Sequence, residues 1–286
     1  MVVLVTGSTG QLGQSLQFLA GNYPEINFVF CSSKELDISD SANCETIFAK
    51  YKPNYCINAA AFTAVDKAET EPEKALLINV IGAKNLAEVC KKHLAVLIHV
   101  STDFVFDGQK TTPYTEDDST RPIGVYGKTK LEGEQAIQSI LKEHFIIRTS
   151  WLYSQFGNNF MKTMLRLASE RDSLSIVNDQ IGTPTNAVDL AKAIITIALS
   201  NNENKVHDKF GIYHFSNEGS CSWFDFAKKI FEVNKIAINL NPIPTTSFPT
   251  PAKRPKYSVL DKTKIKNNFG LTIKKWEDSL EPFPSV

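Results

Sequence analysis

The sequence predicts an α/β protein built on a Rossmann-like, doubly wound parallel sheet with a smaller C-terminal lobe. Through the first 150 residues, short apolar runs alternate with longer amphipathic segments, as in βαβ units whose strands are buried on both faces. A glycine-rich stretch from Gly7 to Gly13 directly follows the first apolar run, where a strand would turn into a helix. After about Trp151 this alternation loosens, which indicates the second lobe.

The strands are expected where apolar residues run together, and the helices where apolar residues recur on one face. The runs that predict strands are Val2–Thr6, Asn27–Phe30, Cys56–Ala61, Val96–Ser101 and Phe145–Ser150. The segments that predict helices between them are Gln11–Ala20, about Glu73–Lys92 and about Val125–Lys142.

The same reading divides the chain into two parts. Residues 1–150 form the expected dinucleotide-binding domain, to which the chain returns around 187–215, and residues 151–186 and 216–286 form the second lobe. Later helices are expected at 159–170, 187–200 and 222–233, the last with Ser222 and Asp225 as an N-terminal cap. Clustered prolines, at 242, 244, 249, 251 and 255, predict an irregular surface segment.

The composition excludes several classes of protein. The 286 residues carry 31 Lys and Arg against 31 Asp and Glu, so the basic surplus of a duplex-binding protein is missing. Five scattered cysteines and five histidines without metal-ligand spacing predict reduced thiols in the cytoplasm and no metal site. No apolar stretch is long enough to span a membrane, and the N-terminal run is too short for a signal peptide.

The glycine-rich stretch has the physical features of a phosphate-binding loop. Gly7 permits a tight turn, Gly10 lets a pyrophosphate approach the backbone, and Gly13 lets the helix pack on the sheet. The helix N-terminus, with Gln11 and Leu12, then offers unpaired N–H groups to the phosphates. The spacing is G-x-x-G-x-x-G, and a glycine triplet without this strand before it would be weak evidence.

The end of the second strand indicates which dinucleotide binds. Sites that prefer NAD place an acidic residue here to hold the ribose 2′-hydroxyl. This chain instead has Ser32, Ser33 and Lys34 before the first acidic residue, Glu35. Two hydroxyls and a cation suit a 2′-phosphate, so the expected cofactor is NADPH, with NADH as the alternative.

A candidate catalytic set follows. Tyr126 and Lys130 are four residues apart, which places both side chains on one face of the predicted helix. A nearby ammonium is expected to lower the phenol pKa of Tyr126 from its usual value of about 10 toward neutrality. Lys130 can also hold the nicotinamide ribose. Thr102 directly follows the fourth predicted strand, Val96–Ser101, at the sheet edge where catalytic groups of such folds lie.

Together, the glycine loop, the strand-end hydroxyl and the Tyr–Lys pair resemble the extended short-chain dehydrogenases. Longer strings then resemble one family of these enzymes, the dTDP-4-dehydrorhamnose reductases, in the same order over nearly the whole chain. The matching strings cover residues 58–69, 101–108, 125–134, 148–151, 157–160, 179–185 and 254–260.

The resemblance implies roles for individual residues. Thr102 would hydrogen-bond the substrate carbonyl while Tyr126 supplies the proton, and Tyr126 and Lys130 would also contact the cofactor. Further cofactor contacts are implied for Asp37 and Ile38 at the adenine and for Ala61, Phe62 and Thr63 along the channel. Substrate contacts are implied for Thr102, Asp103, Trp151, Asn159 and Arg254, whose guanidinium could grip a diphosphate.

The sequence departs from the family at two places. Some members carry acidic side chains that bridge a dimer through magnesium, whereas this chain has Ser15 and Val188 there, so we expect a monomer or a homodimer without such a bridge. Phe62 and Phe104 replace an expected His and Tyr, which leaves the catalytic set intact.

The function that the resemblance implies is reduction of the C4 ketone of dTDP-4-dehydro-L-rhamnose to dTDP-L-rhamnose. Two alternatives stay open at this point. The chain could be a reductase or epimerase of another nucleotide sugar, and retention of oxidised NAD would favour an epimerase. It could instead be a non-catalytic regulatory subunit, against which the complete set of Thr102, Tyr126 and Lys130 argues.

Overall fold

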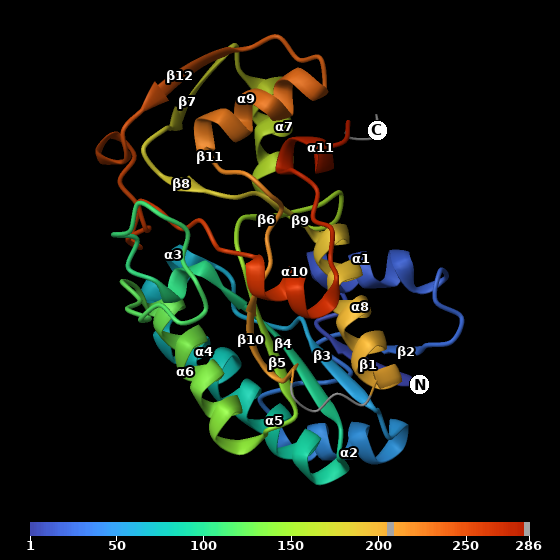
Figure 1. The fold of residues 1–286 in the computed structure, drawn as a ribbon. Helices are drawn as coiled ribbons and strands as arrows, with labels where there is room; N and C mark the ends of the chain where they lie inside the picture. The colour runs from blue at the N-terminus through green and yellow to red at the C-terminus, as the bar shows by residue number, and fades with distance from the viewer. Residues whose placement is uncertain (205–208, 283–286) are drawn as a thin grey trace.

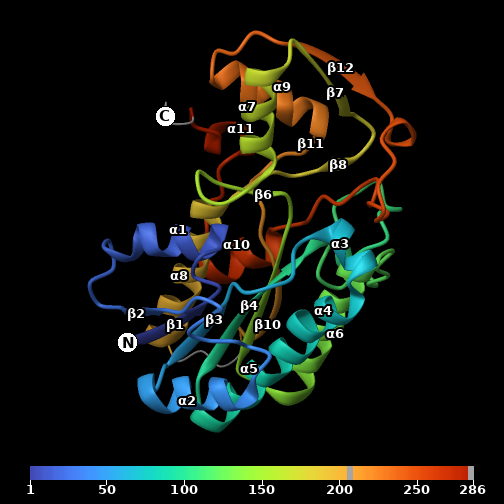
Figure 2. The ribbon, with the colours of Figure 1, turned by 180° about the vertical axis from the view of Figure 1, so that it is seen from behind.

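The computed structural model describes residues 1–204 and 209–282, which form a larger lobe around one sheet and a smaller lobe above it (Figures 1 and 2). Residues 205–208, within the expected return to the first domain, and residues 283–286, at the end of the expected second lobe, lie outside the described residues. Within the described part of the chain, no helix is long and apolar enough to cross a membrane.

The larger lobe contains a six-stranded parallel sheet with the order β10-β5-β4-β3-β1-β2. Its strands are β1 (Val2–Thr6), β2 (Asn27–Phe30), β3 (Tyr55–Asn58), β4 (Val96–Thr102), β5 (His144–Thr149) and β10 (Gly211–His214). Strand β1 pairs with β2 on one side and β3 on the other, so the order reverses beside it. The crevice at the carboxyl ends of β1 and β3 is the place where such folds bind ligands. The predicted α/β class with a doubly wound parallel sheet is confirmed.

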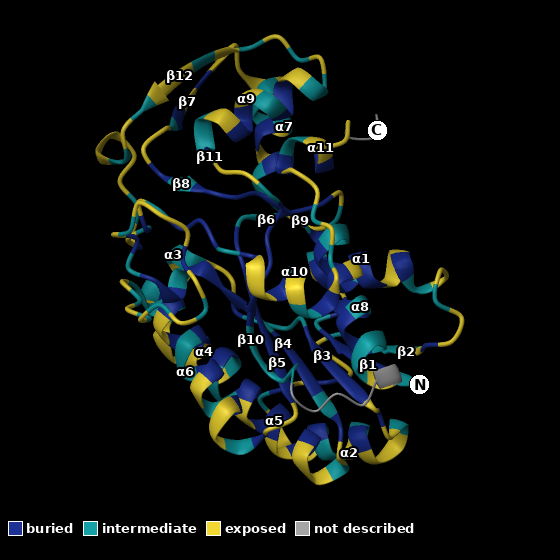
Figure 3. Cartoon of the chain, viewed as in Figure 1, coloured by how far each residue is buried: buried dark blue, intermediate teal, exposed yellow. Residues whose placement is uncertain are grey.

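Two hydrophobic cores cover the two faces of this sheet. Alternate strand residues divide between them, since Val3 and Val5 face one core and Leu4 the other. The helices of the first face are α1 (Gln11–Ala20), α8 (Ala187–Asn204) and α10 (Thr263–Phe269). The helices of the second face are α2 (Ser41–Tyr51), α5 (Gly82–His93) and α6 (Val125–Ile140). Figure 3 shows the strands buried between these layers.

The connection from β3 to α5 differs from the prediction. The expected strand Cys56–Ala61 ends at Asn58, because the Asn58 side chain accepts the Ala60 N–H at 3.1 Å and turns the chain. The expected single helix Glu73–Lys92 is three segments, namely α4 (Pro72–Leu76), the π-helix η1 (Leu77–Ile81) and α5. A short helix, α3 (Val65–Thr70), precedes them. π-Helical turns are frequent at functional sites, and this one contains the buried Asn79.

The smaller lobe packs short elements around its own aromatic and aliphatic core. Its helices are α7 (Phe160–Glu170), α9 (Trp223–Val233) and α11 (Trp276–Ser279). Its strand pairs are β7 (Ser173–Val177) with β12 (Asn239–Ile243), and β8 (Ile181–Gly182) with β11 (Cys221–Ser222). A further pair, β6 (Leu152–Tyr153) with β9 (Thr185–Asn186), lies at the junction of the lobes (Figure 1).

One proline of the predicted irregular segment is in a strand. Pro242 lies in β12. There the Asn239 N–H donates to Asp172 O, and the Ile243 C=O accepts from the Asn178 N–H, so the odd-numbered residues of β12 direct their backbone N–H and C=O groups toward β7. Pro242 therefore points its ring nitrogen away from the partner strand, where a proline is tolerated. The segment after β12 is irregular apart from the short 3₁₀ helix η4 (Thr245–Ser247).

Removing the cap of α9 should weaken the smaller lobe. The predicted cap is confirmed, because Ser222 Oγ accepts Asp225 N–H and the Asp225 carboxylate accepts Ser222 N–H, both at 3.0 Å. We expect Ser222→Ala to lower the free energy of unfolding by about 1 kcal/mol in chemical denaturation. The exposed neighbour Ser220→Ala is the matched control, and equal unfolding curves for the two variants would contradict the cap.

Candidate active site

The glycine loop joins β1 to α1 at the carboxyl edge of the sheet. Gly7 has a φ of 62°, in the left-handed region that glycine adopts without strain. A Cβ on Gly13 would lie 2.4 Å from Gly7 O, so only glycine lets α1 approach the loop this closely. Among the described residues, no side chain caps α1 at Gly10 and no acidic residue lies in its first turn. The N–H groups of this helix end are therefore available to an anion.

The side chains of Gln11, Leu12 and Asn159 are used within the protein. Leu12 is buried in the first core. Gln11 Oε1 accepts hydrogen bonds from Ser154 Oγ at 3.1 Å and Asn159 Nδ2 at 3.0 Å. Asn159 Oδ1 also accepts Lys162 N–H and caps α7. Gln11 and Leu12 can thus meet a ligand through their backbone, while Asn159 links the loop to the smaller lobe.

The loop after β2 lies beside the glycine loop, since Ser8 N–H donates to Cys31 O at 3.1 Å. Ser33 and Lys34 are exposed there. Ser32 donates to Glu35 from both its N–H and its hydroxyl, at 2.8 Å, and these bonds lower the pKa of the Glu35 carboxyl. The two serines and the lysine are accessible to a phosphate, but Glu35 already engages Ser32.

Asp37 and Ile38 follow in the same loop and differ in exposure. Asp37 is exposed and its carboxylate accepts both the N–H and the hydroxyl of Ser39, at 2.9 and 2.7 Å. Ile38 is 4% exposed and packs in the second core. The Ile38 side chain therefore belongs to the core, whereas Asp37 faces solvent.

Asn79 is a residue that the sequence analysis missed. It accepts Phe62 N–H at 2.9 Å and donates to Phe62 O at 3.2 Å and to Thr129 Oγ1 at 3.1 Å. It thereby ties the expected cofactor segment, of which Ala61 is half-buried and Thr63 exposed, to helix α6. A lone Asn among the apolar residues 76–81 was the available signal.

Thr102 and Asp103 lie where β4 ends and the 3₁₀ turn η2 (Asp103–Val105) begins. The Thr102 hydroxyl donates to Asp103 Oδ1 at 3.0 Å and accepts Phe104 N–H at 3.2 Å. Asp103 is 1% exposed, and burial raises the pKa of its carboxyl to about 6. A hydroxyl and a carboxyl that takes up its proton close to pH 6 are therefore side by side at the strand end.

Tyr126 lies in the first turn of α6, with its ring edge-on to Phe104 at a centroid distance of 5.6 Å. Burial raises the pKa of Tyr126 to about 12, a contact with the Thr102 hydroxyl opposes the rise, and Asp103 adds to it. The expectation that Lys130 lowers this pKa is wrong for this structure, because Lys130 Nζ binds Val100 O at 2.7 Å and His99 Nε2 at 3.0 Å. A phenol that stays protonated at neutral pH suits a proton donor.

Helix α3 contacts both this region and the smaller lobe. Glu69 accepts Val125 N–H at the start of α6, at 2.9 Å. Asp66 accepts Ala252 N–H at 3.2 Å and forms an ion pair with Arg254 at 2.8 Å, which lowers the pKa of the Asp66 carboxyl. Neither acidic residue was predicted from the sequence to have a role of its own.

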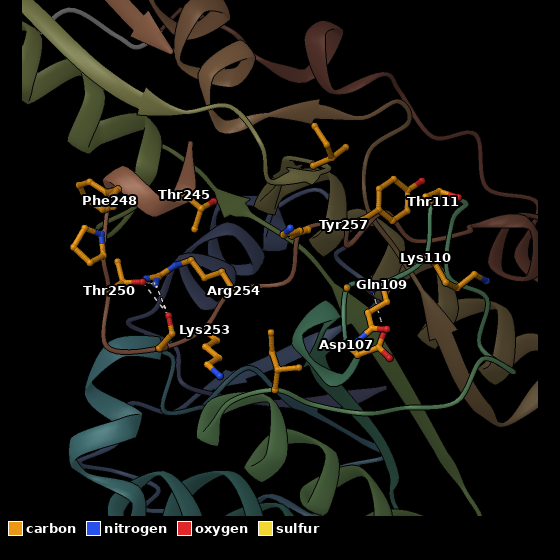
Figure 4. A pocket seen from close by; sticks show the side chains of 16 residues that line it. Asp107, Gln109, Lys110, Thr111, Thr245, Phe248, Thr250, Lys253, Arg254 and Tyr257 are labelled. Atoms are coloured by element: carbon orange, nitrogen blue, oxygen red, sulfur yellow. Dashed lines mark hydrogen bonds between the residues drawn. The ribbon is translucent and has the colours of Figure 1, made fainter. Parts of the chain in front are cut away.

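A cavity of about 900 Å³ opens near the start of α6 (Figure 4). It lies between the loop 107–111, Ile123 and the segment 245–257. Thr102, Tyr126 and Lys130 do not line it, but Ile123 is three residues before Tyr126. Four cations contribute to its wall, namely Lys110, Lys253, Arg254 and Lys256. In Figure 4 Arg254 reaches across toward Thr250, with which it forms a hydrogen bond.

Trp151 lies at the junction of the two lobes. Its φ of 45° is a conformation that bulky residues rarely adopt. Its indole stacks on Trp223 of α9, with a centroid distance of 3.5 Å and an interplanar angle of 9°. The residue therefore joins the end of β5 to the core of the smaller lobe.

The comparisons with known proteins agree with one another. The family model described as the RmlD substrate binding domain matches residues 1–284. A dTDP-4-dehydrorhamnose reductase of Aggregatibacter actinomycetemcomitans is 44% identical over 98% of this chain and 97% of that protein. The crystal structure of a dTDP-4-dehydrorhamnose reductase from Clostridium acetobutylicum has a TM-score of 0.92 at 41% identity, covering 98% of this chain and 97% of that one. One from Bacillus anthracis, in complex with NADP, has a TM-score of 0.91 at 40% identity, with 98% and 96% covered.

The raised pKa of Asp103 predicts a pH-dependent stability. Its pKa is about 6 when folded, against 3.8 ordinarily, so stability falls as pH rises through this interval. We expect Asp103→Asn to raise the free energy of unfolding at pH 7.5, by at most about 3 kcal/mol for a two-unit shift. This gain in the free energy of unfolding should shrink as the pH is lowered to 4, because Asp103 of the wild type is then protonated.

Asp118→Asn is the matched control, measured by the same chemical denaturation. The Lys110 ammonium hydrogen-bonds Asp118 at 2.6 Å and lowers the pKa of that carboxyl, so this variant should lose a little stability at pH 7.5. A loss of stability in Asp103→Asn at pH 7.5 would contradict the interpretation.

Proposed function

The chain belongs to the dTDP-4-dehydrorhamnose reductase family, and on that premise we propose that it reduces the C4 ketone of dTDP-4-dehydro-L-rhamnose to dTDP-L-rhamnose with NADPH. The observation that carries this proposal is the convergence of Thr102, Tyr126 and Lys130. They meet where α6 crosses the end of β4, between the glycine loop and the cationic cavity.

The residues at the carboxyl edge fit a dinucleotide. The uncapped N-terminus of α1 and the close approach at Gly13 would accept the pyrophosphate. Ser33 and Lys34 are exposed where a ribose 2′-phosphate would lie, which favours NADPH over NADH, and the similar Bacillus anthracis enzyme was solved with NADP. When bound, the reduced nicotinamide supplies a hydride to the ketone carbon.

Tyr126 would donate its phenol proton to the oxygen that becomes the alcohol. Its pKa of about 12 keeps the proton on the phenol until negative charge develops on that oxygen. Thr102 would donate a hydrogen bond to the same oxygen, which requires its hydroxyl to leave Asp103. Asp103 would then face the sugar as a largely neutral acid at slightly acidic pH.

The cavity supports a nucleotide-sugar substrate. Arg254, Lys253 and Lys256 supply positive charge for a diphosphate, and Arg254 can present a planar fork to it if it leaves Asp66. Trp151, at the junction of the lobes, would contact the sugar. The positive side chains lie on one lobe and the catalytic set on the other, so the substrate would bridge the two.

The proposal also includes a cytoplasmic location and a monomeric or homodimeric state. All five cysteines are buried and unpaired, which fits the reducing cytoplasm. Ser15 is buried and its hydroxyl donates to Gln11 O at 2.8 Å, and Val188 has no ligating atom. We therefore expect a monomer or a homodimer that needs no magnesium ion at these positions.

The decisive assay is sugar-dependent loss of NADPH absorbance. With dTDP-4-dehydro-L-rhamnose generated in the cuvette, we expect rapid oxidation of NADPH and slower oxidation of NADH. Tyr126→Phe should lower kcat about 10²- to 10⁴-fold, the usual contribution of a general acid. Its folding is checked by circular dichroism and its dinucleotide affinity by titration.

An unchanged kcat in Tyr126→Phe would exclude the proposed proton donor. A folded wild-type protein that binds NADPH but oxidises neither NADPH nor NADH when dTDP-4-dehydro-L-rhamnose is supplied would exclude this substrate. Retention of oxidised NAD through purification would instead favour an epimerase, and co-purification with a larger enzyme would favour a regulatory subunit.

The close approach at Gly13 makes a separate prediction about cofactor binding. A Cβ there would meet backbone atoms at 2.4 and 2.5 Å, so Gly13→Ala must displace α1 or the loop. We expect NADPH affinity in a fluorescence titration to fall at least tenfold. Gly21→Ala, at the other end of the same helix with open space around it and a φ of −63°, should bind as the wild type does. Equal affinities for the two variants would contradict the role of the loop.

A further inference from the structure

A chain of buried polar side chains connects the catalytic lysine to the strand beside the glycine loop. Asn58 at the end of β3, His99 in β4 and Lys130 in α6 are each 1% exposed. Asn58 Nδ2 lies 2.9 Å from His99 Nδ1, and His99 Nε2 lies 3.0 Å from Lys130 Nζ. The proposed function assigns no role to His99 or Asn58.

The direction of these hydrogen bonds follows from a backbone group that can only donate. Ala60 N–H donates to Asn58 Oδ1 at 3.1 Å, and the same oxygen accepts the Thr6 hydroxyl at 2.7 Å. The amide oxygen of Asn58 therefore faces Ala60, and its NH₂ group faces His99. His99 Nδ1 must accept, so it carries no proton.

The protonation of His99 then sets what Lys130 can do. Burial holds the pKa of His99 well below its ordinary value, so the ring is neutral and has a single N–H. With Nδ1 accepting from Asn58, that N–H is on Nε2 and points at Lys130 Nζ. An ammonium has no lone pair to accept it, whereas a neutral amine has one and can still donate to Val100 O at 2.7 Å.

We propose that His99 is a positioning residue that holds Lys130 as a neutral amine in the free enzyme, in a hydrogen-bond chain oriented by Asn58 and the Ala60 N–H. This inference rests on the proposed function only for its effect on turnover. The tautomer of His99 is a property of the protein alone.

The charged groups around Lys130 agree with this assignment. Burial lowers the pKa of Lys130 to about 8, although Glu134, one turn further along α6, opposes the shift. The His99 N–H that points at Nζ lowers this pKa further, because only the neutral amine can accept that hydrogen bond. Arg148 of β5 neutralises Glu134 through three hydrogen bonds, the shortest 2.7 Å. Tyr126, one turn back, stays neutral because its pKa is about 12, and His144 of β5 is kept neutral by burial.

The tautomer is measured directly by NMR of ¹⁵N-labelled free protein at pH 7, with His99 assigned through the backbone resonances of β4. We expect the Nε2–H tautomer, with an acceptor-type shift for Nδ1 and a pyrrole-type shift for Nε2. The Nδ1–H tautomer, or an imidazolium, would overturn the proposal. This result is independent of substrate, so it stands or falls separately from the proposed function.

A second measurement is the alkaline limb of the pH–kcat/KM profile, which reports the pKa of Lys130 in the free enzyme because loss of its proton slows reduction. His99→Gln can turn its amide oxygen to the Lys130 ammonium, so the midpoint should rise by about one pH unit. His144→Gln removes a buried histidine of the next strand that hydrogen-bonds Leu141 O, and its midpoint should match the wild type. An unshifted midpoint in a folded His99→Gln enzyme would overturn the coupling between His99 and Lys130.

Discussion

The active site depends on how closely helix α6 lies against its neighbours. A Cβ on Gly127 would be 2.1 Å from Phe104 O, and one on Gly133 would be 2.2 Å from Asn79 O, so any side chain there would push the helix away. Lys130, between these two contacts, reaches the backbone of β4, and Tyr126, just before Gly127, reaches the strand-end hydroxyl of Thr102. The geometry of the proposed catalytic residues therefore follows from backbone packing: the glycines allow α6 to lie this close, and the polar hydrogen bonds then stabilise that position.

Buried polar groups then fix this position from both sides. The Glu134–Arg148 pair ties α6 to β5, and Asn79 ties it to the segment after β3. Breaking either connection would leave an unpaired buried group, which costs more than the bond itself contributes. Helix α3 extends the arrangement outward, since Glu69 binds the start of α6 while Asp66 binds Arg254 of the smaller lobe. The two lobes are thus linked at the same short helix that supports the catalytic turn.

Elements whose structure is determined by a few neighbouring residues were predicted correctly from the sequence. β1, α1 and the Ser222 cap have the predicted bounds because apolar periodicity and turn chemistry act over a few residues. Helix α2 was missed because only Cys44 and Phe48 are fully buried, with Ile47 partly buried beside them, which leaves a weak periodicity. The Tyr126–Lys130 spacing predicted that both side chains share one face of α6, but the pKa of Tyr126 and the partners of Lys130 depend on burial by distant segments. His99 and Asn79 were overlooked for the same reason, since an isolated polar residue in an apolar run acquires meaning only from the groups that surround it.

The stacked indoles at the junction have a spectroscopic consequence. All three tryptophans of the chain, Trp151, Trp223 and Trp276, pack in the core of the smaller lobe. Tryptophan fluorescence therefore reports on the smaller lobe and is nearly insensitive to changes in the six-stranded sheet. Two parallel indoles 3.5 Å apart should also couple their electronic transitions and give a paired circular dichroism signal near 225 nm. Any separation of the two rings would thus be visible optically, without a label, as loss of this paired signal.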